Sequence, residues 1–260
     1  TQRRSRDRNR VLSQTREFIS TNLHPPAQMM VVAYQRSFQV LQDFTSNPEQ
    51  VLAALRSVRT FTGGRSERER AAKDIVERIK SIESQERSGG RTSGLDTVSP
   101  EWNEVYTLID NYAKESVNDL QFTLDSLRQM ITSLSGLPGK KGIVYISNGL
   151  PMVPGMELFY ELNRVTNNST FLTRMYEYDQ SRLFRQLAAT ANAQDVAFYA
   201  IDASGLSVRG LASAEYQGAQ DPLAASVGDS NRTDTLRLLA DETGGIAIVN
   251  TNDIAPRLDF

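Results

Sequence analysis

Cysteine is absent from this 260-residue sequence, and histidine occurs only once, as His24. The absence of cysteine excludes disulfides, thiol catalysis and thiolate-bound metals, although it leaves the cellular compartment open. A Ser-His-Asp triad would have to use His24, which precedes two prolines and is therefore expected in a loop. No G-x-S-x-G turn presents a serine. The sequence therefore lacks the usual parts of a hydrolase.

A strong charge of one sign and long hydrophobic runs are also missing. The formal net charge is −2 and the pI is about 5.6, which gives no electrostatic reason to expect nucleic acid. The longest apolar runs are too short for a transmembrane helix. The segment 136–141 lacks the spacing of a phosphate loop, no G-x-G-x-x-G follows a strand, and no acidic pair stands out as acid and base. We expect a protein that is not an enzyme, with no catalytic residue and no cofactor.

The segment around which the rest of the chain is organised is 140–151, KKGIVYISNGLP. Its apolar run Ile143–Ile146 predicts a strand buried on both faces, as in the middle of a parallel sheet. Ser147 and Asn148 follow at its carboxyl end, where open α/β sheets place their binding crevices. The sequence therefore places a candidate site at this edge of the sheet.

Further strands and helices alternate along the chain. We predict strands at 29–34, with a hairpin return through 38–44, at 196–201, ending in Asp202, and at 246–249. Helices are predicted near 11–22, 48–55, 180–193 and 233–242, with another beginning at 252, while 150–173 and 206–230 are expected to be irregular. The arginine-rich start, residues 3–10, is expected to be a solvated helix face. This order predicts an α/β fold with a doubly wound, mostly parallel sheet.

Residues from about 65 to 136 interrupt this alternation and predict a helical-hairpin insertion. Ser99 and Pro100 are typical of a helix start, and they precede an apolar stripe from Trp102 to Leu134. The stripe permits a coiled-coil dimerisation helix. We favour the alternative, in which the stripe covers the sheet or the preceding helix.

Four segments together resemble a von Willebrand factor type A (VWA) domain. They are LPGKKGIVYISNGLP, VAFYAIDASGL, LRLLADETGGIAIVNTNDI and MMVVAYQRSFQVLQDFTSNPEQVLAAL. The sequence is more narrowly similar to the VWA-related group known from acidobacterial proteins, over most of the chain except about 65–135 and 206–230. The resemblance implies a Rossmann-like sheet, and many VWA domains bind Mg²⁺ at its top.

The metal-binding motif of such domains is degenerate here. No D-x-S-x-S motif occurs, Arg65 stands at the usual threonine position after Thr62, and Asn148 replaces the aspartate that follows the central strand. Mg²⁺ prefers oxygen ligands that include a carboxylate, and an arginine nearby would repel it. Asp202 is expected to cap the loop that follows its strand. We therefore expect no metal in this chain, and Mg²⁺ only if upstream residues supply the carboxylates.

The first central strand of the VWA order is also missing from the sequence. The resemblance places that strand between the 29–34 and 143–146 strands, whose backbone groups would otherwise remain unpaired. We expect that the chain is a fragment at both ends and that an apolar strand precedes Thr1. Direct pairing of the strands that contain Tyr34 and Ile146 would refute this expectation.

These observations predict a single VWA-like domain over 1–260 that binds a protein partner. A Mg²⁺-dependent adhesion domain completed by upstream residues, and a structural subunit that oligomerises through the 101–135 helix, are the alternatives. A periplasmic or extracellular bacterial location is expected from the family resemblance. The apolar segment 150–153 is either an anchor for the partner or buried beneath 206–230. The predicted binding surface is the sheet top: Gln35, Arg36, Thr62, Arg65, Ser147, Asn148, Leu150, Asp202 and Ser204.

Overall fold

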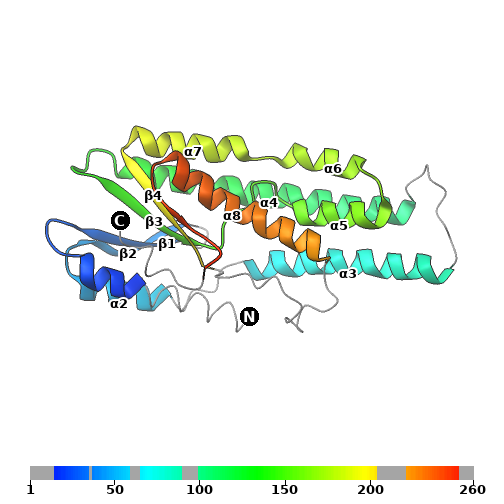
Figure 1. The fold of residues 1–260 in the computed structure, drawn as a ribbon, viewed down its shortest axis with the longest axis horizontal. Coiled ribbons are helices and arrows are strands. Elements are labelled where there is room, and N and C mark those ends of the chain that lie inside the picture. The colour runs from blue at the N-terminus through cyan, green and yellow to red at the C-terminus, as the bar shows by residue number, and fades with distance from the viewer. Residues whose placement is uncertain (1–14, 35–36, 59–64, 90–98, 204–220, 252–260) are drawn as a thin grey trace.

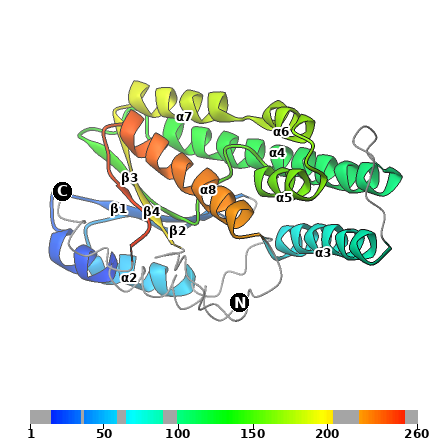
Figure 2. The same cartoon turned by 45° about the vertical axis from the view of Figure 1, so that its right-hand side comes forward.

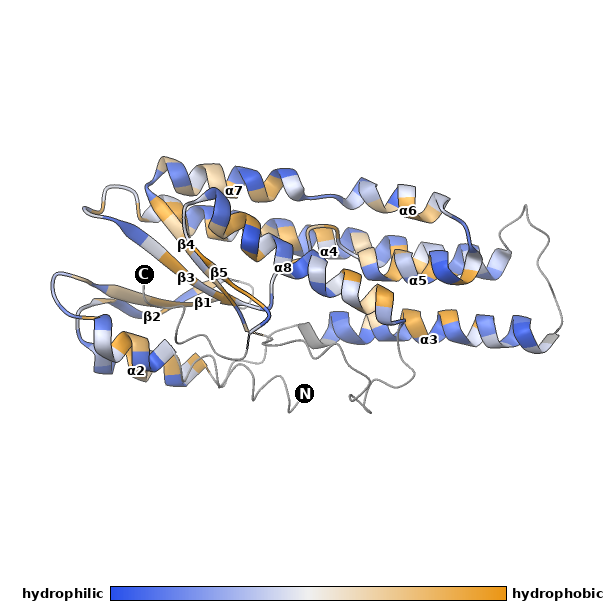
Figure 3. Ribbon diagram, viewed as in Figure 1, coloured by the Kyte–Doolittle hydropathy of each residue, from blue (hydrophilic) through white to orange (hydrophobic). Residues whose placement is uncertain are grey.

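A computed structural model describes residues 15–34, 37–58, 65–89, 99–203 and 221–251. The protein is elongated, with its strands at one end and long helices extending from them (Figure 1). The strands carry both hydrophobic and hydrophilic residues, and hydrophilic residues are frequent along the outer helix α3 (Arg65–Gly89) (Figure 3). The described part is a mixed α/β structure.

The first sheet is an antiparallel pair of strands, β1 (Met29–Tyr34) and β2 (Phe38–Thr45). Their register places Val32 opposite Val40. Helix α2 (Pro48–Ser57) follows, and the Asn47 side chain caps it by accepting the Glu49 N–H at 2.9 Å. The predicted hairpin and the predicted short helix are confirmed.

The second sheet is parallel and has the order β3 (Lys141–Ser147), β4 (Val196–Asp202), β5 (Ala247–Ile248). Helix α7 (Ser181–Ala193) leads into β4, and α8 (Pro222–Glu242) leads into β5. These strand–helix–strand units confirm the predicted α/β class and its parallel strands.

Helices cover both faces of the strands. Figures 1 and 2 show α4 (Pro100–Ser133) and α7 on one side and α2 on the other. We call the first interior the α4–α7 core and the second the α2 core. The α4–α7 core contains Leu120, Leu124, Leu127, Ile131, Phe184, Leu187 and Phe198. The α2 core contains Val51, Ala54, Leu55, Val31 and, from the helical residues 15–22, Ile19.

The burial predicted for β3 is wrong. Among the described residues β3 pairs with β4 and stands at the end of the order β3-β4-β5. None of its residues is buried, whereas Phe198, Ala200 and Ile201 of β4 are. β4 lies between two strands of this sheet, which accounts for its deeper burial. β1 lies in the other sheet, so the strands that contain Tyr34 and Ile146 do not pair.

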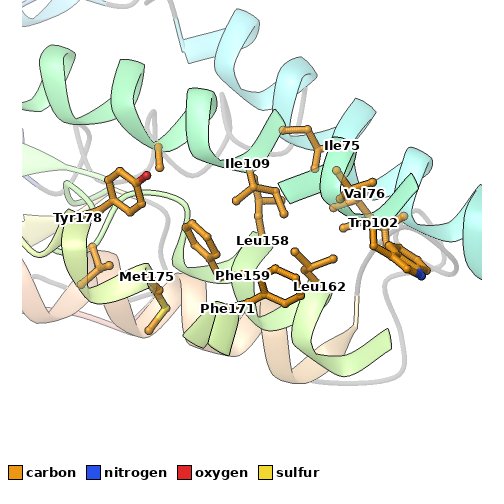
Figure 4. Close-up of a cluster of buried hydrophobic side chains, with 14 of the residues drawn as sticks. Ile75, Val76, Trp102, Ile109, Leu158, Phe159, Leu162, Phe171, Met175 and Tyr178 are labelled. Atoms are coloured by element: carbon orange, nitrogen blue, oxygen red, sulfur yellow. The ribbon is translucent and has the colours of Figure 1, made fainter. Parts of the chain in front are cut away.

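The insertion consists of the two helices α3 and α4, as predicted. The first half of the α4 stripe packs with Ile75 and Ile79 of α3 and with Phe159 of α5 (Met156–Thr166) in the cluster of Figure 4. The second half packs in the α4–α7 core. The stripe thus covers both the preceding helix and the sheet, and the face considered for a coiled coil is buried inside the chain. Ser99 occupies the capping position, although its hydroxyl makes no capping hydrogen bond.

Two segments predicted to be irregular are largely helical. Residues 150–173 include α5 and the start of α6 (Thr170–Met175), which continues into a 3₁₀ turn (Tyr176–Tyr178). Helix α8 begins at Pro222, inside the segment expected to be a loop, because the Asp221 carboxylate accepts the Leu223 and Ala224 N–H groups. Small residues that pack closely, such as Gly228 against Glu157, replace the large apolar residues that would have signalled this helix.

No helix in the described residues has the length and apolarity needed to cross a membrane.

Candidate functional site

The carboxyl ends of β3 and β4 form the edge at which the sequence predicts a binding surface. Ser147 and Asp202 are partners in the parallel register, and the Ala203 N–H donates to the Ser147 carbonyl oxygen at 2.9 Å. Asp202 is buried, whereas Ser147 and Asn148 are partly exposed. The structure therefore brings Ser147 and Asp202 together, as predicted for neighbouring parallel strands. The expectation that Asp202 belongs to an exposed binding surface is wrong, because its side chain is buried.

The loop that follows β3 is held against α8. Gly149 has a φ of +74°, and a Cβ at this position would overlap the carbonyl group of Arg232. The Leu150 N–H donates to Thr235 Oγ1 at 3.4 Å, and the Thr235 hydroxyl donates to the Leu150 carbonyl at 2.9 Å. Close backbone approach and reciprocal hydrogen bonds thus fix the chain directly after Asn148.

Asn231 of α8 holds the next part of the loop. Its side-chain oxygen accepts the Val153 N–H at 2.9 Å, and its amide nitrogen donates to the Val153 carbonyl at 2.8 Å. The Met152 N–H also donates to the Asn231 carbonyl at 3.3 Å. Asn231 is buried, so these bonds replace solvent for both backbone groups. The loop is consequently a rigid support for the residues at the sheet edge.

Leu150 and Val153 do not project as free anchors. Leu150 packs against the α4–α7 core, and Val153 is buried in the cluster of Figure 4. Of the two alternatives for 150–153, packing within the chain is the one observed for Leu150 and Val153, and α8 bonds to the backbone of this loop.

The remaining predicted site residues lie outside the described part. Gln35, Arg36, Thr62 and Ser204 are not described, and Arg65 is described only as the backbone that begins α3. Four of the predicted side chains are therefore placed: Ser147, Asn148, Leu150 and Asp202.

The described residues contain no group of three or more His, Cys, Asp or Glu side chains positioned to hold a metal ion. His24 lies in an exposed loop, as predicted, with Nδ1 2.9 Å from the Asn22 carbonyl oxygen. The polar groups at the sheet edge are hydroxyl, amide and carboxylate, which recognise hydrogen-bonding partners.

A pocket of about 260 Å³ lies at the opposite, amino end of β3 and β4. Lys140, Lys141, Asn192, Asp195 and Tyr199 contribute to its lining. The sequence does not predict this pocket. Its cations and carboxylate lie far along the strands from Ser147 and Asp202, so it is separate from the site at the carboxyl edge.

Sequence reasoning also misses a partly buried ion-pair cluster between the insertion and the rest of the fold. Glu161 is only 1% exposed; its carboxylate pairs with Arg164 at 2.9 Å and accepts the Asp221 N–H at 3.2 Å. Arg164 also donates two hydrogen bonds to Glu83 of α3, at 3.2 and 3.3 Å. The bond from Arg164 lowers the pKa of Glu83, and the two carboxylates raise the pKa of Arg164. The cluster joins α3, α5 and the start of α8, and we assign it a structural role.

An acidic residue between apolar ones was the available signal for this cluster. Glu161 lies between Phe159 and Leu162, both fully buried. A charged residue at such a position is buried only with a partner, but the sequence does not identify Glu83 or Arg164 as that partner.

Comparisons with protein-family models, with curated proteins and with solved structures found no match to this chain. The VWA resemblance therefore remains an expectation from the sequence.

Proposed function

We propose that this chain is a non-enzymatic, VWA-like protein-interaction domain with a Rossmann-like, doubly wound design and a degenerate metal site. Its binding surface lies at the carboxyl edge of β3 and β4 and includes Ser147 and Asn148, which are partly exposed, whereas Asp202 is buried beside them. Supporting this, parallel α/β sheets bind their ligands outside the carboxyl ends of their strands.

The observation that carries the proposal is the fixed loop behind this edge. Gly149, Leu150 and Val153 are held by α8 through close packing and hydrogen bonds. A surface that is rigid before binding loses little conformational entropy on association, which favours recognition of a partner. Asn148 offers both a donor and an acceptor at this surface.

The partner is proposed to be a protein, with no nucleic acid and no cofactor involved. The net charge of −2 gives no attraction to nucleic acid. From the resemblance alone, we place the domain in the bacterial periplasm or outside the cell. Oligomerisation through α4 is not supported, because its apolar stripe is used in the interior of the chain.

Site-specific photo-crosslinking tests the proposal. A photoreactive amino acid replaces Asn148 at the edge in one variant and Gln186, an exposed residue of α7, in the control. In cells that naturally make the protein, we expect a discrete protein adduct from position 148 that is absent from position 186. Adducts from both positions alike, or from neither, would refute a binding surface at this edge.

A further inference from the structure

The pocket at the amino ends of β3 and β4 has a volume of about 260 Å³ and is separate from the proposed binding surface. Its lining residues come from the start of β3, the turn before β4 and the carboxyl ends of α7 and α8. Lys141 and Ser147 are the first and last residues of β3, so the pocket lies roughly 20 Å from the carboxyl edge. A small ligand in this pocket therefore does not occupy the surface proposed for a protein partner.

β4 forms an apolar wall of the pocket, which Val196, Ala197 and Tyr199 line. Gly142 of β3 is the register partner of Ala197, and a Cβ at Gly142 would lie 3.0 Å from Cε2 of the Tyr199 ring. The ring therefore lies directly against β3 at a position without a side chain. The two small residues of this cross-strand pair leave room beside the ring, where an apolar group of a ligand can pack.

Two ammonium groups and one carboxylate line the same pocket without pairing with one another. Within the described part of the chain, neither Lys140 nor Lys141 forms an ion pair with Asp195. Lys141 Nζ donates one hydrogen bond, to the Leu137 carbonyl at 3.3 Å, which leaves two of its three N–H groups. Lys140 is exposed, and the described residues offer its ammonium group no hydrogen bond.

The uncharged polar groups of the pocket are already engaged. The Thr243 hydroxyl accepts the Phe198 N–H at 2.9 Å and donates to the Leu239 carbonyl at 2.6 Å. The Asn192 side chain donates one of its N–H groups to the Glu242 carbonyl at 2.8 Å. The charged groups are consequently the main ones left to bind a ligand.

Opposite charges that are held apart in one small pocket match a ligand that carries both charges. A simple anion would meet the Asp195 carboxylate as well as the lysines, and a simple cation would meet both lysines. A zwitterion avoids both repulsions, and the partial negative charge at the carboxyl end of α7 also favours its ammonium group. The volume is below the range of about 300–1,000 Å³ that is typical of sites for drug-sized ligands, so the ligand is small.

We propose that this pocket binds a free α-amino acid with an apolar side chain. The carboxylate of the amino acid is bound by the ammonium groups of Lys140 and Lys141, and its ammonium group pairs with Asp195. Its side chain packs against the wall formed by Ala197 and Tyr199. The site is additional to the protein-binding surface and does not depend on it.

Titrations followed by the backbone amide resonances of Val196 and Ala197 test this proposal. L-phenylalanine and L-leucine are the probes, and each is compared with the acid that lacks its ammonium group and with the amine that lacks its carboxylate. We expect at least one of the amino acids to bind with a Kd of about 1 mM or lower. Its two analogues are expected to bind at least about tenfold more weakly, because each loses a hydrogen bond between charged groups.

Variants of the charged residues locate the site. Asp195→Asn and the double variant Lys140→Gln/Lys141→Gln are each expected to weaken binding at least about tenfold. Asp195 has a φ of +53°, a conformation that asparagine also adopts readily, so this substitution preserves the turn. The control Lys73→Gln removes an exposed lysine of α3, far along the chain from the pocket, and is expected to leave Kd unchanged.

Three results would overturn the proposal. One is the absence of any amide shift with either amino acid up to about 10 mM, a concentration at which a Kd of about 1 mM gives near-saturation. Another is equal affinity for an amino acid and its two analogues. The third is unchanged affinity in both pocket variants. Shifts confined to Ser147 and Asn148 would place the ligand at the opposite end of the strands and would equally contradict this site.

Discussion

Replacing Asn231 by alanine tests whether α8 fixes the loop behind the proposed binding edge. The substitution removes an acceptor 2.9 Å from Val153 N and a donor 2.8 Å from Val153 O, both in a buried environment. Each buried backbone group left without a partner costs about 1–3 kcal/mol. We therefore expect Asn231→Ala to lower the free energy of unfolding by about 2–6 kcal/mol. For a chain of this size each kcal/mol lowers Tm by about 2–4 °C.

Urea unfolding followed by circular dichroism measures this loss, and Asn192→Ala is the matched control. Asn192 also donates a side-chain hydrogen bond to a backbone carbonyl, that of Glu242 at 2.8 Å, but in an exposed position. Water replaces the lost partner there, so we expect a loss of about 1 kcal/mol or less. Equal losses for the two variants would refute the view that Asn231 holds the loop through buried hydrogen bonds.

Three further predictions concern the ion-pair cluster and the loop. Arg164→Met leaves the buried carboxylate of Glu161 without its cation, so we expect it to lower the free energy of unfolding by about 3–5 kcal/mol. The control Arg237→Met breaks an exposed pair with Asp234 and is expected to lower it by less than about 1 kcal/mol. Urea unfolding measures both changes. The hydrogen bond from Arg164 lowers the pKa of Glu83 below 4.5. The ionised Glu83 carboxylate therefore stabilises the folded state fully above pH 4.5, and this contribution is lost as the pH falls through the lowered pKa. Unfolding free energies measured across this acid range are expected to fall less steeply for Glu83→Gln, and parallel curves would contradict the assignment. Gly149→Ala is expected to destabilise the folded state by at least about 2 kcal/mol more than Gly136→Ala. Both glycines have a positive φ, but only Gly149 lies against backbone atoms. Equal shifts of Tm in the two variants would contradict this expectation.

The strands and most helices could be predicted because their residues carry local signals. The apolar, β-branched run Ile143–Ile146 and the similar run that ends in Asp202 predict strands, and the parallel sheet contains both. The long stripe of α4 predicts a buried helix face because its steps of three and four residues match the helical period.

Other features depended on contacts between distant segments. The burial of β3 could not be predicted from Ile143–Ile146, since burial depends on what pairs with the second edge of the strand. Helix α5 begins directly after Gly155, which has a left-handed conformation and follows Pro154, and both residues usually indicate a turn. Helix α8 has too few large apolar residues in 222–230 to show a helical period.

The strand ends at the candidate site could be predicted from the sequence, whereas the contacts that support them could not. Ser147 and Asp202 are the last residues of two apolar strands, and parallel register alone brings them together. The supporting contacts from Asn231 and Thr235 could not be predicted, because polar residues within a helix give no indication of the distant loop they bind.

The most direct test of the proposed function is the affinity of Asn148→Arg for the protein that position 148 crosslinks. Calorimetric titration of the purified partner is compared for the unchanged protein, for Asn148→Arg and for Gln186→Arg on α7. A large cation at the edge is expected to weaken binding at least about tenfold, which is roughly 1.4 kcal/mol, while Gln186→Arg leaves Kd unchanged. Unchanged affinity for Asn148→Arg, in a variant that melts like the unchanged protein, would contradict a binding surface at the carboxyl ends of β3 and β4.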